Sequence, residues 1–218
     1  MKTPVGTLLL VLLLCCCDCF AAPSAELRIV VLGDSLTAGY GLPQEAAFPA
    51  RLEEALKHRG RQVRVVNAGV SGDTSMGGLA RLDWSLGDDP DLMIVELGAN
   101  DALRGLSPQQ TRENLDRLLA RLQQQGVQAL LTGMKAPRNM GEDYYTKFDQ
   151  IYPDLAQKYD LPFYPFFLAG VVGDPELNQA DGIHPTRAGV DVIVRSILAT
   201  VEEALDKIAT QREGDNIP

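Results

Sequence analysis

The chain has 218 residues, of which 45% are hydrophobic, and its formal net charge at neutral pH is −9. This length is enough to bury one sizeable core, and no interior stretch rich in Gly, Pro or Ser divides it, so we expect one domain. The acidic balance argues against nucleic acid as a partner, and a total of two histidines argues against a histidine-based zinc site.

Residues 1–25 have the pattern of a signal peptide: Lys2, then an apolar run over 8–14, then small residues near 21–25. The run is too short to span a bilayer. All four cysteines fall in this segment, so its cleavage would leave no thiol. We therefore expect a secreted or periplasmic protein without a stable membrane span. A lipoprotein is the less favoured alternative, because Leu14 rather than a small residue precedes Cys15.

After this segment, short β-branched or apolar runs alternate with longer stretches of helical period. This pattern is typical of repeated βαβ units, in which helices cover a parallel sheet. It predicts an α/β domain over residues 26–210, followed by a flexible tail over 211–218. The expected strands are Arg28–Leu32, Gln62–Asn67, Leu92–Leu97, Gln128–Gly133 and Leu161–Tyr164.

The best specified helix lies between the third and fourth strands. Ser107 is placed to cap it, Pro108 suits its first position, and Gln110 would complete a capping box. Leucines over 115–122 recur on one face and form its buried stripe, and Gly126 is placed to end it.

Two further helical stretches follow. Apolar positions between Met140 and Asp160 recur at helical spacing, but Pro153 interrupts them and predicts a kink or a restart. The last helix is expected from near Pro185 to about Ile208.

Small and polar residues follow the first three strands. The first strand runs into Gly33–Leu36, the second into Asn67–Asp73 and the third into Gly98–Asp101. In open α/β sheets the ligand crevice lies beyond the carboxyl ends of the strands, so these segments are the candidate site.

A serine becomes a useful nucleophile when an imidazole takes its proton and a third group orients that imidazole. Ser35 follows the first strand directly. His184 is the candidate base, because Asp181 precedes it by three residues on one turn and a helix follows it. His58 lies among charged helix residues, which indicates a surface position.

Acyl transfer also needs donors for the charge that develops on the carbonyl oxygen. The backbone N–H groups of Ser35 and Gly72 and the side-chain amide of Asn100 are candidates, since all three follow neighbouring strands. Glycine at 72 suits close approach of the backbone to a ligand.

Other polar residues near these strand ends have supporting interpretations. Asp34 is predicted to cap the turn after the first strand. Asp73, Glu96 and Asp101 are predicted to hold the surrounding loops, and Ser71 and Ser75 are disfavoured as rival nucleophiles. Five residues after the fourth strand either line an acyl groove or pack in the core, and both readings stay open: Met134, Pro137, Met140, Tyr144 and Tyr145.

Four blocks carry a family resemblance: GDSLTAGYG at 33–41, NAGVSGDTS at 67–75, ELGAND at 96–101 and DGIHP at 181–185. Together they resemble the GDSL esterases of the SGNH hydrolase superfamily, closest to its thioesterase, lysophospholipase and arylesterase subgroup. The resemblance implies Ser35 as nucleophile, His184 as base with Asp181 as its orienting partner, and Gly72 and Asn100 as oxyanion donors beside the Ser35 amide. It also implies a flavodoxin-like three-layer α/β/α fold around a five-stranded parallel sheet, with no cofactor and no metal.

The expected function is that of a secreted serine esterase acting through an acyl-enzyme on small esters, thioesters or lysophospholipids. An O-acetyl esterase or acyltransferase acting on carbohydrate remains an alternative. A non-catalytic small-ligand binding module is disfavoured, since the chain lacks both G-x-G-x-x-G and a Walker motif.

Overall fold

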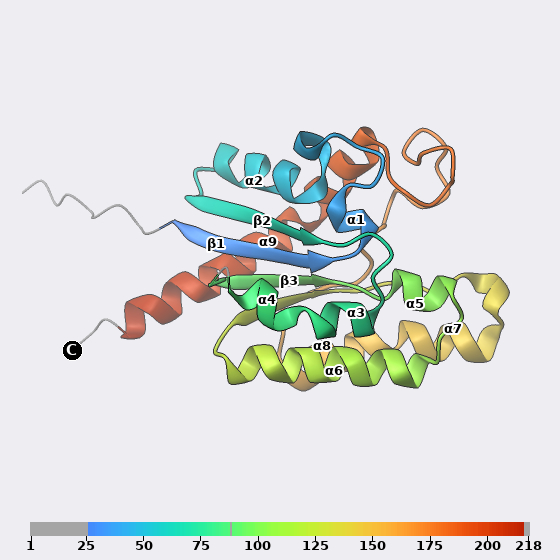
Figure 1. Ribbon diagram of the computed structural model, residues 1–218. Helices are drawn as coiled ribbons and strands as arrows, with labels where there is room; N and C mark the ends of the chain where they lie inside the picture. Colours follow the sequence, from blue (N-terminus) through green and yellow to red (C-terminus); the bar gives the residue numbers. More distant parts are fainter. Residues whose placement is uncertain (1–25, 88, 216–218) are drawn as a thin grey trace, which may run out of the picture.

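A five-stranded parallel sheet forms the middle layer of the molecule, as Figure 1 shows. The computed structural model describes residues 26–87 and 89–215, so the expected leader and the last three residues of the expected tail lie outside the described part. The strand order is β2-β1-β3-β4-β5. This is the flavodoxin-like order of a doubly wound sheet, and the predicted fold class is confirmed.

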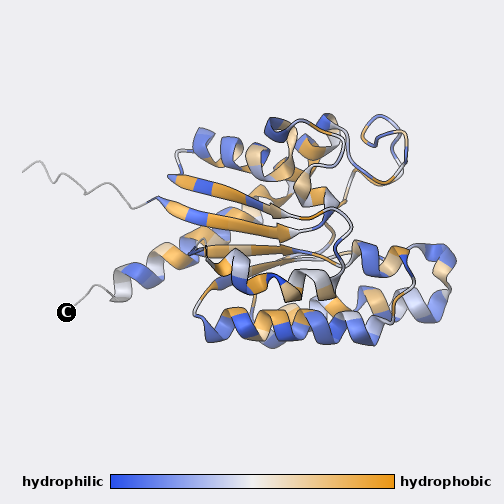
Figure 2. Cartoon of the chain, viewed as in Figure 1, coloured by the Kyte–Doolittle hydropathy of each residue, from blue (hydrophilic) through white to orange (hydrophobic). Residues whose placement is uncertain are grey.

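Each strand begins and ends within two residues of its predicted bounds. The three central strands are buried along most of their length, as expected for a sheet that helices cover on both faces. Figure 2 shows this as apolar strands between helices whose outer faces are hydrophilic. The strands are β1 (Leu27–Gly33), β2 (Val63–Gly69), β3 (Leu92–Glu96), β4 (Gln128–Thr132) and β5 (Phe163–Tyr164).

Helices form the two outer layers. The pair α2 and α9 lies on one side of the sheet, whereas α3, α4, α6 and α8 lie on the other (Figure 1). No helix in the described part of the chain combines the length and apolar character needed to cross a bilayer. The helices are α1 (Ser35–Ala38), α2 (Phe48–His58), α3 (Ser75–Ala80), α4 (Leu82–Leu86), α5 (Ala99–Leu103), α6 (Pro108–Gln124), α7 (Glu142–Asp149), α8 (Ile151–Tyr159) and α9 (Arg187–Asp215), with 3-10 turns at Gln44–Ala46 and Arg138–Met140.

Helix α6 has the predicted bounds but not the predicted cap. Pro108 is its first residue and Gly126 follows its end with a positive φ of 72°. Ser107 occupies the N-cap position, yet its side chain makes no capping hydrogen bond. The Gln110 side chain points along the helix to Asn114, so the predicted capping box is wrong.

Two later helices also differ in detail from the sequence prediction. The restart predicted near Pro153 is present, but the break falls at Gln150, because proline is tolerated in the first turn of α8. Helix α9 continues to Asp215, past the expected end at Ile208. The Arg212 side chain pairs with Asp91 beside the sheet, which anchors this extra length.

Candidate active site

Ser35 lies where the chain turns sharply out of β1. Strand β1 ends at Gly33, and Asp34 then caps α1 by accepting a hydrogen bond from the Leu36 amide at 3.0 Å, as predicted. A Cβ at Gly33 would lie 2.0 Å from the Thr37 hydroxyl oxygen, so only glycine fits there. This turn makes Ser35 the first residue of α1, with 9% of its surface exposed.

The loop before α9 brings His184 to this serine. One oxygen of Asp181 accepts the backbone N–H groups of Ile183 at 2.9 Å and His184 at 3.0 Å. The other oxygen lies 2.6 Å from His184 Nδ1. His184 Nε2 lies 2.9 Å from Ser35 Oγ. The loop therefore connects carboxylate, imidazole and hydroxyl in one chain of hydrogen bonds.

The electrostatics of the loop fix the direction of these bonds. The backbone N–H of His184, followed by its side chain, lowers the pKa of Asp181 to about 2, so this carboxyl is ionised near neutral pH. An ionised carboxylate only accepts hydrogen bonds, so Nδ1 carries the imidazole proton. In the neutral imidazole Nε2 is then an acceptor, and the Ser35 hydroxyl donates to it.

Tyr40 and Gln179 contact His184 and the loop that carries it. The ring centroids of Tyr40 and His184 are 4.4 Å apart, with the planes tilted by 34°. Gln179 donates from its side-chain amide to the carbonyls of Tyr40 and Pro185, at 2.7 and 3.0 Å, and from its backbone to the His184 carbonyl at 2.7 Å. These contacts hold the imidazole against the turn after β1.

The three candidate oxyanion donors, two backbone N–H groups and one side-chain amide, differ in the acceptors that they have. Within residues 26–87 and 89–215, the N–H groups of Ser35 and Gly72 donate to no other group. The Asn100 side-chain nitrogen donates to Asp34 Oδ2 at 3.0 Å and to the Asp73 carbonyl at 2.9 Å. Because Asp73 directly follows Gly72, these bonds hold the Asn100 amide next to the Gly72 peptide.

Two buried carboxyls lie beneath these donors. Glu96 Oε2 accepts from the Thr37 hydroxyl at 2.8 Å and from the Asp34 backbone at 3.3 Å. Burial raises the pKa of Asp34 to about 6. Burial, followed by repulsion from Asp34, raises the pKa of Glu96 well above its ordinary value. Both sites thus favour the protonated form more than an exposed carboxyl does.

A mainly apolar cavity of about 640 Å³ opens beside Ser35 and His184. Asn100, Lys135 and Arg138 also line it, and aliphatic and aromatic side chains form most of the remaining wall. This arrangement suits an ester whose carbonyl sits at the hydroxyl and whose acyl chain lies on the apolar wall. The apolar wall includes Leu36, Ala102, Leu103, Met134, Pro137, Phe166, Leu168, Val172 and Ile183.

Not every candidate from the sequence joins this cavity. Of the five residues after β4, Met134 and Pro137 line it, whereas Met140, Tyr144 and Tyr145 do not. The Tyr144 hydroxyl donates to a backbone carbonyl at 2.8 Å instead, and the Tyr145 ring packs against an arginine.

The rival serines and the second histidine lie elsewhere. Ser75 is buried, with its hydroxyl 2.5 Å from a carboxylate oxygen of Asp101 and its amide bonded to the other oxygen, as a structural residue should be. Ser71 and His58 are exposed. In the described part of the chain, neither serine forms a hydrogen bond with a histidine.

Comparison with known proteins identifies the family. A family model described as the GDSL-like Lipase/Acylhydrolase family matches residues 31–192. The chain belongs to this family. The resemblance read from its four sequence blocks is confirmed, and this GDSL protein is a carboxylic ester hydrolase.

Its relatives cover most of the chain. The arylesterase of Vibrio mimicus is 42% identical over 166 residues, which are 76% of this chain and 83% of that protein. The thioesterase 1/protease 1/lysophospholipase L1 of Escherichia coli K12 is 43% identical over 169 residues, covering 77% and 79%. A crystal structure of TesA superposes with a TM-score of 0.77 at 39% identity, covering 81% of this chain and 99% of that one.

The structure brings Ser35, Asp181 and His184 together in one chain of hydrogen bonds. Sequence reasoning missed two residues that contact the candidate base or its loop, namely Tyr40 and Gln179. Tyr40 lies inside the first block, five residues after Ser35, and only the fold shows that its ring reaches the imidazole. Within the described residues, no group of three or more histidine, cysteine or acidic side chains is placed to hold a metal ion.

Proposed function

We propose that this GDSL hydrolase cleaves acyl esters through a covalent acyl-enzyme on Ser35, with His184 as the base and Asp181 as its orienting partner. The observation that carries the proposal is the hydrogen-bond chain from Asp181 through His184 to the Ser35 hydroxyl, at 2.6 and 2.9 Å. This chain ends at the mouth of the apolar cavity, where a substrate carbonyl has room to approach.

The reaction runs in two halves. His184 Nε2 takes the Ser35 proton while the serine oxygen bonds to the acyl carbon, and the carbonyl oxygen becomes an oxyanion. The bond to the leaving oxygen or sulfur then breaks, and that atom receives the proton from Nε2. Water repeats the sequence with His184 again as base, which releases the acid and restores the serine. Asp181 stabilises the imidazolium that forms in both halves.

The oxyanion is bound by the backbone N–H groups of Ser35 and Gly72 and by the Asn100 amide. Support for the backbone pair is that neither N–H has another acceptor in the described structure. Asn100 already donates to Asp34 and to the Asp73 carbonyl, so it shares one of these hydrogens with the oxyanion. Each such donor contributes about 2.7–4 kcal/mol to the transition state.

The cavity supports acyl chains longer than acetyl. Its volume of about 640 Å³ lies within the usual range for small-molecule sites, and its wall is mainly aliphatic. Arylesters, thioesters and lysophospholipids all present such an acyl group, and the names of the relatives include arylesterase, thioesterase and lysophospholipase. We propose these classes as substrates, with the acyl group rather than the leaving group setting the fit.

We also propose that the enzyme acts after export. The basis is the sequence of residues 1–25, with Lys2, an apolar run and small residues near 21–25. Edman sequencing of the protein recovered from the periplasm or medium tests this. A recovered chain that still begins at Met1 would contradict cleavage.

Substitution of the nucleophile tests the mechanism. Ser35→Ala should lower kcat for p-nitrophenyl butyrate on the order of 10⁴-fold or more, because no other hydroxyl among the described residues has the His184 imidazole as a partner. Circular dichroism should show an intact fold, since alanine fits the space. Intact-mass spectrometry should show one acyl or phosphonyl adduct on the wild type and none on the variant.

Ser71→Ala is the matched control, because this exposed serine follows β2 near Gly72 and, in the part of the chain that the structure describes, has no hydrogen bond with a histidine. Its turnover should stay within about twofold of wild type, as is usual for surface substitutions. Wild-type turnover by Ser35→Ala would contradict the proposed mechanism.

A further inference from the structure

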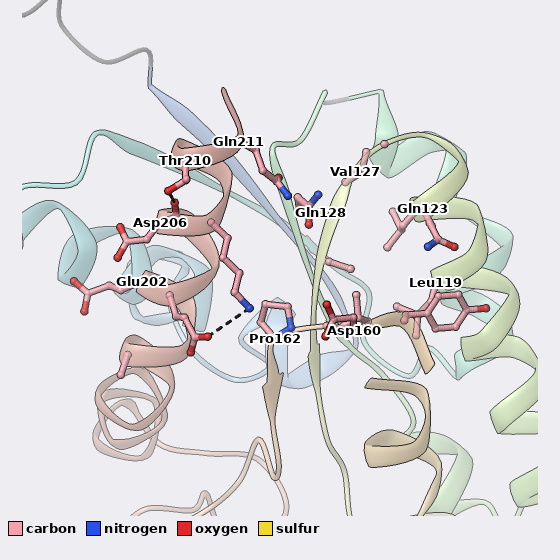
Figure 3. A pocket seen from close by; sticks show the side chains of 18 residues that line it. Leu119, Gln123, Val127, Gln128, Asp160, Pro162, Glu202, Asp206, Thr210 and Gln211 are labelled. Carbon is pink, nitrogen blue, oxygen red and sulfur yellow. Dashed lines mark hydrogen bonds and ion pairs between the residues drawn. The ribbon is translucent and has the colours of Figure 1, made fainter. Parts of the chain in front are cut away.

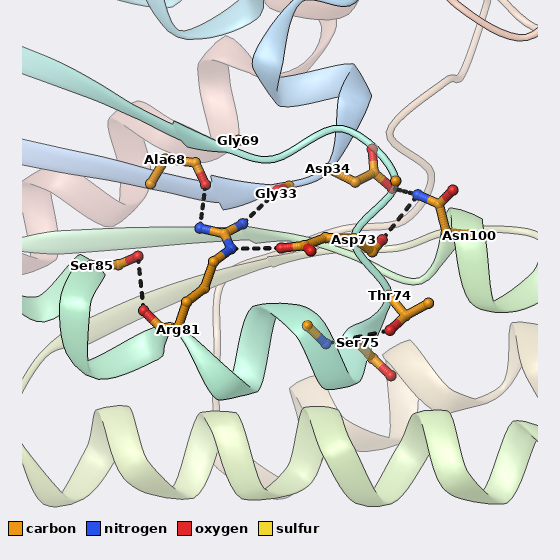
Figure 4. A network of polar contacts seen from close by, with 12 residues as sticks. Gly33, Asp34, Ala68, Gly69, Asp73, Thr74, Ser75, Arg81, Ser85 and Asn100 are labelled. Carbon is orange, nitrogen blue, oxygen red and sulfur yellow. Dashed lines mark hydrogen bonds and ion pairs between the residues drawn. The ribbon is translucent and has the colours of Figure 1, made fainter.

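Arg81 joins the segments that carry two of the three proposed oxyanion donors, the backbone N–H groups of Ser35 and Gly72. It lies between α3 and α4 and does not line the substrate cavity, and Figure 4 shows its guanidinium pointing at the carboxyl ends of β1 and β2. Its Nε donates to Asp73 Oδ2 at 2.6 Å, Nη1 to the Ala68 carbonyl at 2.7 Å and Nη2 to the Gly33 carbonyl at 2.8 Å. One planar group thus binds three acceptors from two strand ends.

Two of the three acceptors, Gly33 and Asp73, are close in the sequence to residues that carry proposed oxyanion donors. Gly33 precedes Ser35 by two residues, so its carbonyl fixes the turn that orients the Ser35 N–H. Asp73 directly follows Gly72, and its own carbonyl accepts from Asn100. The three donors come from three different strand ends, and the guanidinium sets two of those ends at a fixed separation.

The local sequence provides room for this contact. A Cβ at Gly77 would lie 2.6 Å from a carboxylate oxygen of Asp73, so glycine in α3 lets that carboxylate reach Arg81. The side chains of Asp73 and Arg81 are only 18% and 17% exposed. A pair sheltered to this degree is screened less by water and salt than a surface ion pair.

We propose that Arg81 is a positioning residue of the oxyanion hole, which it sets through Gly33 and Asp73 without touching substrate. Arginine suits this role because its donors lie in a rigid planar fork. Lysine carries the same charge but has one nitrogen, so it cannot hold three acceptors in a plane. The inference rests on the proposed function, since it assumes that the donors stabilise an oxyanion.

The test compares Arg81→Lys and Arg81→Ala with wild type, normalised to the active sites titrated with diethyl p-nitrophenyl phosphate. A misplacement of about 1 Å can cost on the order of 10²-fold in rate, so kcat per active site should fall about 10- to 100-fold, more for alanine than for lysine. KM for p-nitrophenyl butyrate should change less than about threefold, because the donors act mainly on the transition state.

A double-substitution cycle separates positioning from general support of the fold. In an Asn100→Ala background one donor is already lost, so Arg81→Lys should lower kcat by less than about threefold if it acts through the same hole. Arg121→Lys is the matched control, because Arg121 forms an exposed ion pair with Asp83 on the same side of the sheet. Its kcat should equal that of wild type.

Asp73→Asn gives a second route if the Arg81 variants fold poorly, since it keeps the shape of the acceptor but removes its charge. It should lower kcat with little change in KM, by less than Arg81→Ala does. An unchanged kcat per active site in Arg81→Lys, or an equal loss with and without Asn100, overturns the inference. Neither result touches the Ser35 mechanism, which fails only if Ser35→Ala keeps its turnover.

Discussion

The two ends of the sheet carry two hollows that differ in kind. At the amino ends of β4 and β5, between α6 and α9, lies a hollow of about 1040 Å³, shown in Figure 3. At the carboxyl ends lies the smaller cavity of about 640 Å³ that Ser35 and His184 line. A choice of the functional site by cavity volume alone would therefore select the amino end of the sheet, away from Ser35 and His184.

The polar groups at the two ends are connected differently. At the amino end they are charged side chains of α9 in ion pairs: Glu203 with Lys207, Asp206 with Arg61, and Glu202 with Arg59 and Arg61. At the carboxyl end one chain of hydrogen bonds runs from the exposed Asp181 through the imidazole to the serine, and the Asn100 amide donates to the buried Asp34. The candidate functional end is thus marked by a chain that joins a carboxylate, an imidazole and a serine hydroxyl, and not by the larger volume.

Substitution of matched aspartates at the two ends should give the largest contrast. Asp181→Asn should lower kcat on the order of 10³-fold, because an amide can donate to Nδ1 and so select the tautomer whose Nε2 cannot accept the serine proton. Asp160→Asn at the amino end should leave kcat within about twofold. Asparagine tolerates the left-handed φ of 52° at that position, so the control keeps its fold.

Steady-state kinetics with p-nitrophenyl butyrate, on protein checked by circular dichroism, measures both variants. Equal effects of Asp181→Asn and Asp160→Asn would contradict the contrast between the two ends. A full rate in Asp181→Asn would remove the carboxylate from the proposed mechanism.

The wall of the carboxyl-end cavity should set the preference for acyl length. Val172 lines this cavity and is 59% exposed, so Val172→Asp adds a charge to the acyl path without disturbing the core. Losing the burial of a valine-sized surface costs about 1.5 kcal/mol, which corresponds to roughly a tenfold rise in KM for p-nitrophenyl octanoate. KM for the acetate should change little, since a two-carbon acyl group stays near Ser35.

Trp84→Asp is the control for added charge at an exposed apolar side chain, since Trp84 is 72% exposed and lines neither cavity. Its ratio of octanoate to acetate turnover should match that of wild type. A Val172→Asp enzyme with unchanged octanoate kinetics would place the acyl chain elsewhere.

Most of the sheet and the contact between Asp181 and His184 could be predicted from the sequence, because both depend on short-range patterns. Buried parallel strands are continuous apolar runs, and the strand ends that follow carry Ser35 and Asn100. Asp181 and His184 share one turn, so their contact follows from spacing alone. The capping box at Ser107 failed because side-chain rotamers decide it, and sequence does not fix those.

The residues that hold the site could not be predicted, since their contacts join distant parts of the chain. Arg81 reaches the Gly33 carbonyl across 48 positions, and Gln179 reaches the Tyr40 carbonyl across 139. Every residue has a backbone carbonyl, so the spacing of residue types along the sequence could not identify the carbonyls to which Arg81 donates. Such contacts appear only when the order of the strands is known.

Substitution of the buried carboxyl of Glu96 should give the smallest effect, and this effect should be on the stability of the fold rather than on the rate. Because burial raises the pKa of Glu96 in the folded state, its contribution to stability is fully present below its unfolded pKa and is lost as pH rises. Glutamine does not ionise, and its oxygen can keep the bonds from Thr37 and Asp34 at the Oε2 position. The NH2 group of the glutamine would take the place of Glu96 Oε1, which has no hydrogen-bond partner within the described residues.

Glu96→Gln should therefore be more stable than wild type at pH 8, on the order of 1 kcal/mol, and the difference should vanish near pH 4. Urea unfolding at pH 4, 6 and 8 measures it. Glu203→Gln, in the exposed ion pair at the amino end, should change the free energy of unfolding by less than about 0.5 kcal/mol at each pH. If Glu96→Gln were instead less stable at pH 8, Glu96 would contribute to the fold as an ion, and the linked network at the carboxyl end would depend on its charge.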